Sequence, residues 1–248
     1  TTLSNAQDPG FFLDDWEEKT AIIPDSLNIG KTVEAPTVTI QVDAGRVIAK
    51  VPRYIYGNNA VTWDDGLRKN TTAMTDLINL DPHVLRWPGG NLSNSYFWNR
   101  AYGDRPTDLP EDINPWYGMQ CPDWQMSLDE YYWLLEQTNS TGSVCVNYDY
   151  ARYGTGPDPV AAAAHMAAEW VRYANITKEY NVKYWEIGNE MWHNNKGPLS
   201  LNAIIDITST YAEAMKAVDP TIKVGVSWHD RDGQRALMEN CGDALDFI

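Results

Sequence analysis

The sequence predicts an α/β protein built as a (β/α)8 barrel, of which this chain supplies about strands 1–6. Short apolar segments alternate with amphipathic helical segments, which is typical of parallel strands joined by helices. Polar and aromatic residues follow the carboxyl ends of five successive strands, where a barrel carries its functional residues. A doubly wound sheet would instead concentrate them at one switch point. The length of 248 residues allows one to two domains.

The N-terminal region, residues 1–52, differs in character from the rest of the chain. Residues 1–36 contain Pro, Asp and Gly with little periodicity, which predicts an extended arm. Residues 37–42 and 46–51 alternate apolar and polar side chains on either side of an Asp-Ala-Gly turn. This pattern predicts a β-hairpin outside the main fold. We expect the barrel portion to occupy residues 53–248.

Strands and helices then alternate along the chain. We predict strands at residues 54–57, 83–87, 143–147, 183–190 and 223–228, with the start of a sixth at 245–248. We predict helices at residues 66–80, 127–138, 159–175, 199–218 and 232–240. Asp158 and Pro159 mark the third helix, as its cap and first-turn residue. Because a barrel needs eight strands, we expect a C-terminal half or a second polypeptide to complete it.

The charge balance disfavours several classes of partner. The chain has 19 basic and 34 acidic residues, a formal net charge of −15. This balance disfavours nucleic acid and anionic lipid, both of which require a basic surface. No apolar run approaches the roughly 18 residues of a membrane helix. We therefore expect a neutral partner, no nucleic acid and no membrane, and the acidic composition favours a secreted or extracellular protein.

The aromatic residues are unevenly distributed among the three types. There are 11 Trp and 14 Tyr but only 4 Phe. Trp and Tyr rings carry a polar group, and such rings stack on sugar faces and hydrogen-bond to hydroxyls. The alternative explanation is a large aromatic-rich core.

Glu190 is the candidate catalytic residue. It ends the predicted strand 183–190, and Trp192 follows two residues later. We expect nearby apolar rings to desolvate this carboxyl group, which suits it to exchange protons near neutrality. Asn189 offers a donor and an acceptor to a sugar hydroxyl. Glu186 would lie about 13 Å from Glu190 along one strand, too far for a catalytic pair, so we expect it to be a buried partner of Arg86.

Further candidates for substrate binding follow the predicted strands: Arg86, Asn91, Asn58, Asn147, Asp149, Trp192, Trp228 and His229. Asp149 is equally consistent with a second carboxylate or a helix cap, and His229 with a surface role. His193 is an additional candidate. The sequence has no Gly-x-Gly-x-x-Gly or Walker loop and no recognisable metal-ligand spacing. We therefore expect no cofactor and assign no metal site.

Three short motifs carry a family resemblance. Residues 184–192, Tyr-Trp-Glu-Ile-Gly-Asn-Glu-Met-Trp, resemble the strand-four motif of clan A glycoside hydrolases. Residues 85–91, Leu-Arg-Trp-Pro-Gly-Gly-Asn, are similar to the strand-two motif of family 51 α-L-arabinofuranosidases, and Tyr56-Gly57 with the following Asn pair resembles their first strand. The resemblance implies a retaining (β/α)8 enzyme.

The same resemblance implies roles for individual residues. Glu190 would be the acid/base, Asn189 would bind the 2-hydroxyl, and Arg86 would lie near the nucleophile. That nucleophile, a Glu at the end of strand seven, has no counterpart in this sequence. The N-terminal hairpin would belong to an accessory β-sandwich.

The function implied is an arabinofuranosidase-like hydrolase acting on a plant or algal polysaccharide. One alternative is an endo-acting hydrolase of the same clan, an agarase or glucanase, in which loop aromatics line several sugar-binding subsites. These aromatics are Trp98, Trp116, Trp124 and Trp192. Another alternative is a non-catalytic carbohydrate-binding fragment, which would account for the aromatics and the missing nucleophile together.

Overall fold

The computed structural model describes residues 38–41, 49–192 and 199–248. The chain divides into two compact units, Thr1–Ile55 and Tyr56–Ile248. In the first unit, the described residues contain a 3-10 turn, η1 (Arg53–Ile55).

The predicted N-terminal elements fall largely beyond these ranges. The arm, residues 1–36, and the hairpin turn within residues 42–48 lie outside the described residues. The described flanks of the hairpin, 38–41 and 49–52, carry no strand. The assignment of this region to an accessory β-sandwich stays a prediction.

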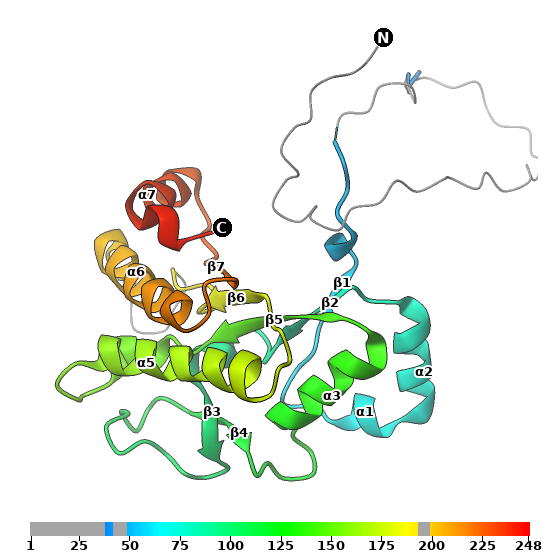
Figure 1. The fold of residues 1–248 in the computed structure, drawn as a ribbon, viewed down its shortest axis with the longest axis horizontal. Coiled ribbons are helices and arrows are strands. Elements are labelled where there is room, and N and C mark those ends of the chain that lie inside the picture. Colours follow the sequence, from blue (N-terminus) through cyan, green and yellow to red (C-terminus); the bar gives the residue numbers. More distant parts are fainter. Residues whose placement is uncertain (1–37, 42–48, 193–198) are drawn as a thin grey trace, which may run out of the picture. The chain divides into compact units, whose positions relative to one another are not determined.

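The second unit is organised around a parallel sheet of five strands in the order β1-β2-β5-β6-β7 (Figure 1). The strands are β1 (Gly57–Asn59), β2 (Val84–Trp87), β5 (Thr141–Val146), β6 (Tyr184–Ile187) and β7 (Lys223–Gly225). Phe247 pairs in parallel with Gly225, which begins a sixth strand. Spatial order therefore follows chain order, as expected for consecutive β/α units of a barrel.

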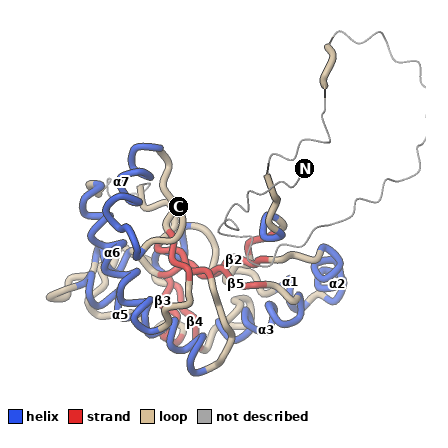
Figure 2. The backbone as a smooth tube through the Cα atoms, turned by 45° about the horizontal axis from the view of Figure 1, so that its top comes forward, coloured by secondary structure: helices blue, strands red, loops and turns tan. Residues whose placement is uncertain are grey.

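Helices connect the strands and surround the sheet (Figure 2). They are α1 (Gly66–Lys69), α2 (Thr71–Leu80), α3 (Leu128–Thr138), α4 (Asp149–Tyr153), α5 (Pro159–Val171), α6 (Leu201–Val218) and α7 (Arg231–Cys241). A π-helical turn, η3 (Arg172–Thr177), extends α5, and a 3-10 turn, η4 (Gly242–Ala244), follows α7.

Local side-chain chemistry explains the helix starts. Asp158 accepts a hydrogen bond from the Ala161 N–H, and Pro159 is the first residue of α5, as predicted. The predicted helix 66–80 is instead two helices. Asn70 adopts an extended backbone between them and caps the second by accepting from the N–H groups of Thr72 and Ala73. Asn is a favoured N-cap, and this explains the break.

A small second sheet is inserted between β2 and α3. It pairs β3 (Tyr96–Ala101) with β4 (Trp116–Met119) and follows the 3-10 turn η2 (Asn91–Ser95). Trp98 of β3 is buried, stacks on Trp170 at 6.0 Å and donates its ring N–H to the Met166 carbonyl at 2.9 Å. The expectation that Trp98 floors a subsite is therefore wrong, because α5 covers it.

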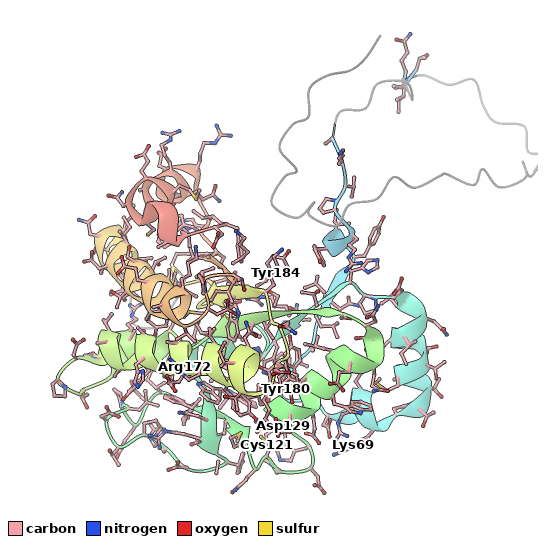
Figure 3. All side chains as sticks on the ribbon, in the orientation of Figure 1. Lys69, Cys121, Asp129, Arg172, Tyr180 and Tyr184 are labelled. Carbon is pink, nitrogen blue, oxygen red and sulfur yellow. The ribbon has the colours of Figure 1, made fainter. Side chains whose placement is uncertain are left out.

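Side chains fill the space between the sheet and its helices (Figure 3). Much of the aromatic excess lies in this core. Trp87 of β2 stacks on Tyr131 of α3 with ring centroids 4.8 Å apart. Trp170 of α5 meets Trp185 of β6 edge to face at 5.9 Å. All four side chains are fully buried. The aromatic-core explanation holds for these rings and leaves the exposed aromatics to be explained separately.

Candidate active site

Asn189 is the centre of a hydrogen-bonded network just beyond the carboxyl end of β6. Its buried side chain accepts from Arg86 Nη2 at 3.0 Å and donates from Nδ2 to Asn91 Oδ1 at 2.9 Å. Its backbone N–H donates to Asn94 Oδ1 at 2.7 Å, and its carbonyl accepts from Asn94 Nδ2 at 2.8 Å. The β2 strand and the turn η2 thus hold Asn189 in a fixed orientation.

Arg86 and Glu186 form an ion pair beneath this network. The Arg86 Nε to Glu186 Oε2 distance is 2.6 Å, and the side chains are 24% and 13% exposed. Burial alone would lower the pKa of Arg86, but the neighbouring Cys145, Glu186 and Glu190 outweigh it and raise the pKa. The pairing predicted for Glu186 is confirmed, and Arg86 stays a fixed positive charge.

The backbone turns sharply between β6 and Glu190. The strand ends at Ile187, and Gly188 and Glu190 have left-handed φ values of 64° and 46°. The predicted strand 183–190 is therefore too long, because left-handed residues cannot continue the strand ladder. Glu190 is exposed, so the expected desolvation of its carboxyl group by apolar rings is absent from the described chain. Its N–H points to Ser227 Oγ at 3.4 Å, on the segment after β7.

Three predicted site residues form one aromatic group. Trp192, Trp228 and His229 have ring centroids 5.2 to 5.9 Å apart. Asp230 orders this group by accepting from Trp228 Nε1 at 3.0 Å and lying 3.3 Å from His229 Nε2. The strand predicted at 223–228 ends at Gly225, so Trp228 and His229 lie in the loop that leads to α7.

The remaining predicted residues take different positions. Asn147 is buried, donates to the Tyr96 carbonyl and accepts from the Tyr150 N–H, so its amide holds β3 and the start of α4. Asp149 is the first residue of α4 and is half-buried. Asn58 is exposed in β1, whose preceding residues 53–55 form a 3-10 turn instead of the predicted strand. His193 lies outside the described residues.

Asn94 and Ser227 were not predicted from the sequence. Asn94 lies three residues after Asn91, so one turn of the 3-10 helix η2 separates them. The three-residue spacing would have pointed to Asn94 only if a helical turn had been predicted after Gly90.

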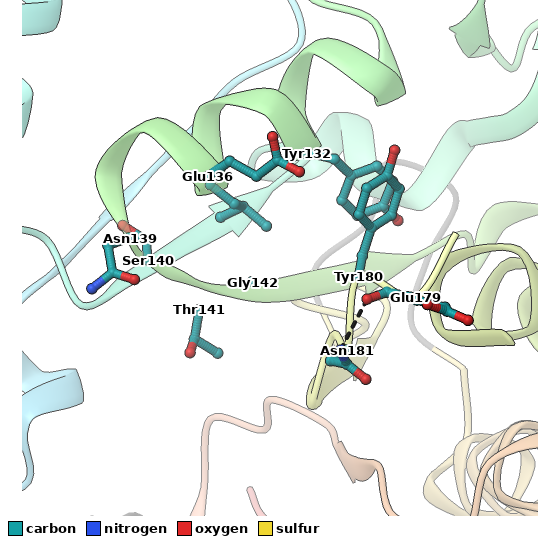
Figure 4. A pocket seen from close by; sticks show the side chains of 10 residues that line it. Tyr132, Glu136, Asn139, Ser140, Thr141, Gly142, Glu179, Tyr180 and Asn181 are labelled. Carbon is teal, nitrogen blue, oxygen red and sulfur yellow. Dashed lines mark hydrogen bonds between the residues drawn. The ribbon is translucent and has the colours of Figure 1, made fainter. Parts of the chain in front are cut away.

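A pocket of about 320 Å³ lies at the opposite end of the strands (Figure 4). Thr141 and Gly142 at the start of β5 contribute to it, and the rings of Tyr132 and Tyr180 stack there at 4.0 Å. Asn181 Nδ2 donates to the Glu179 carbonyl at the same wall. Asn189 and Glu190 lie at the carboxyl ends of the strands, so this pocket is not part of the candidate active site.

Residues 38–41, 49–192 and 199–248 contain neither a metal-ligand group nor a membrane-spanning helix. No three His, Cys, Asp or Glu side chains there are grouped so that they could hold a metal ion. None of the helices described has both the length and the apolar character to span a bilayer.

The geometry agrees with a family model. Residues 76–247 match the model described as "Alpha-L-arabinofuranosidase 1 domain". The chain belongs to this α-L-arabinofuranosidase family. The match extends from α2 to the sixth strand and includes Arg86, Asn189 and Glu190.

Curated relatives and solved structures agree with this family. Alpha-L-arabinofuranosidase C of Emericella nidulans is 28% identical over 77% of this chain and 41% of its own length. The intracellular exo-alpha-(1->5)-L-arabinofuranosidase of Acetivibrio thermocellus is 25% identical over 74% of this chain and 40% of its own length. The thermostable GH51 α-L-arabinofuranosidase structure from Thermotoga petrophila has a TM-score of 0.58 at 22% identity, over 82% of this chain and 46% of that one.

The chain corresponds to only part of each relative. It spans about two fifths of the length of the curated relatives it matches. The structural similarity confirms the predicted fold, the first six strands of a (β/α)8 barrel.

Proposed function

We propose that the protein containing this chain is a retaining arabinofuranosidase-type glycoside hydrolase with Glu190 as its acid/base. The observation that carries the proposal is the position of Glu190. It directly follows Asn189, which Arg86, Asn91 and Asn94 hold at the carboxyl end of β6. Catalytic residues of (β/α)8 enzymes lie at this end of the strands.

The reaction takes two steps with balanced proton transfers. Glu190 gives its proton to the glycosidic oxygen while a carboxylate outside this chain attacks the anomeric carbon, which releases the leaving alcohol. Glu190, now ionised, then takes a proton from water as that water attacks the same carbon and frees the carboxylate. Asn189 retains one amide hydrogen beyond its bond to Asn91, and we assign that hydrogen to the sugar 2-hydroxyl.

The proposed substrate is an arabinose-bearing plant polysaccharide. Support comes from the family and from the name of one relative, which specifies exo action on α-(1→5) linkages. The Glu190 N–H points to Ser227, the residue before Trp228, and the aromatic group of Trp192, Trp228 and His229 offers a stacking surface for the sugar. An extracellular location stays a prediction, since the name of that relative specifies an intracellular enzyme.

The decisive experiment is Glu190→Gln in the protein expressed with its natural flanking sequence. We expect turnover of arabinan to fall by about 10²–10⁴-fold, because the proton donor is lost. An activated aryl arabinofuranoside should be cleaved with a much smaller loss, because its leaving group needs little protonation. Glu213→Gln on α6, also an exposed acid, is the matched control and should leave both rates unchanged.

Two outcomes would contradict the proposal. An equal loss on both substrates would exclude Glu190 as the proton donor. Absence of turnover by the unaltered protein, together with retained carbohydrate binding, would favour the non-catalytic alternative.

A further inference from the structure

Two loops bordering the candidate active site are hydrogen-bonded to each other. Residues 60–65 follow β1, and residues 122–126 precede α3. The Met126 N–H donates to the Thr62 carbonyl at 2.9 Å, and the Asp65 N–H donates to the Trp124 carbonyl at 3.1 Å. The Thr62 hydroxyl donates to the Met126 carbonyl at 2.8 Å. The two loops are thus fixed as one unit.

The two hydrogen-bonded loops contain both fully buried and strongly exposed side chains. Thr62, Asp65, Gln125 and Met126 are buried almost completely and supply the internal contacts of this unit. Trp63, which lies between Thr62 and Asp65, and Trp124, which directly precedes Gln125, are 47% and 50% exposed. A tryptophan exposed on a flexible loop would lose conformational entropy on binding a ligand, whereas these two backbones are already ordered. We call Trp63 and Trp124 the tryptophan ledge.

The ledge is connected to the site through Gly89. The indole of Trp63 lies over Gly89, where a Cβ atom would come within 2.8 Å of its ring. Gly89 has φ 126° and stands between Arg86 and Asn91, both bonded to Asn189. The Thr62 N–H also donates to the Pro88 carbonyl at 2.9 Å. Trp63 therefore rests on the loop that orients the candidate active site.

Trp124 extends the aromatic surface in another direction. It packs edge to face with Tyr102 and with Trp116, at centroid distances of 6.2 Å in both cases. Tyr102 is itself 53% exposed. An exposed aromatic surface of this kind marks an interaction site.

We propose that the tryptophan ledge binds successive sugar units of a neutral polysaccharide and so continues the active site. Indole rings combine an apolar face for sugar stacking with an N–H for a hydroxyl. The formal charge of −15, with Asp64 and Asp123 beside the two tryptophans, disfavours an anionic polymer. The proposal rests on the proposed function only for the identity of the sugar unit that is cleaved at Glu190. It predicts that the enzyme recognises a chain and not a terminal sugar alone.

Trp63→Ala and Trp124→Ala test the ledge in the protein with its natural flanking sequence. The substrates are linear arabinan and an activated aryl arabinofuranoside, which is too short to reach the ledge. We expect each substitution to raise KM for arabinan about fivefold to tenfold. Trp124→Ala should leave both constants for the aryl substrate unchanged, whereas Trp63→Ala, which removes a contact with Gly89, should change them less than it changes KM for arabinan. Trp133→Ala is the matched control, because Trp133 is similarly exposed on α3 and packs against Arg68 instead.

The outcomes separate the ledge from the proposed function. If all constants for arabinan stay unchanged in both variants, the ledge is refuted and the catalytic assignment stands. If the unaltered protein cleaves neither substrate, affinity electrophoresis in gels containing arabinan, xylan or agarose decides. Retardation that Trp63→Ala and Trp124→Ala abolish but Trp133→Ala preserves supports the ledge without the enzyme, and no retardation in any gel refutes it.

Discussion

Replacing Arg86 with Met should destabilise the fold through the charge it leaves behind. Arg86 Nε lies 2.6 Å from Glu186 Oε2, and the Glu186 side chain is only 13% exposed. Met fills most of the space of the arginine stem but leaves the carboxylate without its cation. Removing one partner of a buried pair costs about 3–5 kcal/mol. Because the Arg86 side chain is 24% exposed, we expect a loss near the lower limit, about 3 kcal/mol.

The assay is equilibrium unfolding in urea followed by tryptophan fluorescence. A loss of this size lowers the midpoint by about 1–3 M for a slope of 1–3 kcal/mol/M. Adding Glu186→Met to Arg86→Met should restore much of the loss, because an apolar pair can replace a buried ion pair. Arg100→Met is the matched control, since Arg100 pairs with Asp104 at 3.1 Å where the side chains are 36% and 59% exposed. That pair should contribute less than about 1 kcal/mol.

The coupling between the two residues decides whether the reasoning is correct. If Arg86→Met costs no more than Arg100→Met, the ion pair does not stabilise the fold. If the effects of Arg86→Met and Glu186→Met simply add, the two side chains act independently and the uncompensated charge is not the cause.

Three other substitutions or reagents probe separate features. Burial opposes ionisation of Asp246, but Lys216, the Val224 N–H and Lys223 outweigh burial and lower the pKa of Asp246. Its stabilising effect, about 1.5–3 kcal/mol, should therefore be present above about pH 4 and disappear as pH falls through the lowered value. Urea unfolding of Asp246→Asn and of the parent should accordingly converge in acid. Burial raises the pKa of Cys145, so iodoacetamide at pH 8 should label it only after unfolding, and mass spectrometry showing rapid native labelling would contradict this. Gly89→Ala should lower the free energy of unfolding by about 1–3 kcal/mol because alanine disfavours the left-handed backbone there, and by a further amount because the new Cβ meets the Trp63 ring. Gly103→Ala is the control for the backbone contribution alone, because Gly103 has φ 86° and no atom within 4 Å of the new Cβ.

The alternation of strands and helices could be predicted because it depends on local patterns. Asp158 and Pro159 identified the start of α5, and the apolar run around residue 144 identified β5. The break at Asn70 was missed, because its capping role depends on an extended backbone at that residue, which periodicity does not reveal. Trp98 was misjudged for a related reason: a sequence shows an aromatic residue in a loop but not the helix that covers it.

The sequence named individual residues of the candidate site but not the hydrogen-bonded network that joins them. The Arg86–Glu186 pair followed from opposite charge and from the face of the strand on which Glu186 lies; Arg86 is in β2 and Glu186 in β6, with β5 between them in the parallel sheet. The double bond between Asn94 and the Asn189 backbone did not follow, because it requires the turn η2 to bring residue 94 back over β6. Long-range contacts of this kind depend on loop geometry, which short motifs do not encode.

The turn after β6 determines how Glu190 can act. If the strand had continued, Glu190 would have lain on the same face as Glu186, about 13 Å further along the strand. Instead Gly188 and Glu190 adopt left-handed backbone conformations and carry the carboxyl group to the surface. Trp192 packs against Trp228 and His229. In the proposed mechanism, a sugar stacked on these rings would exclude water from the Glu190 carboxyl group.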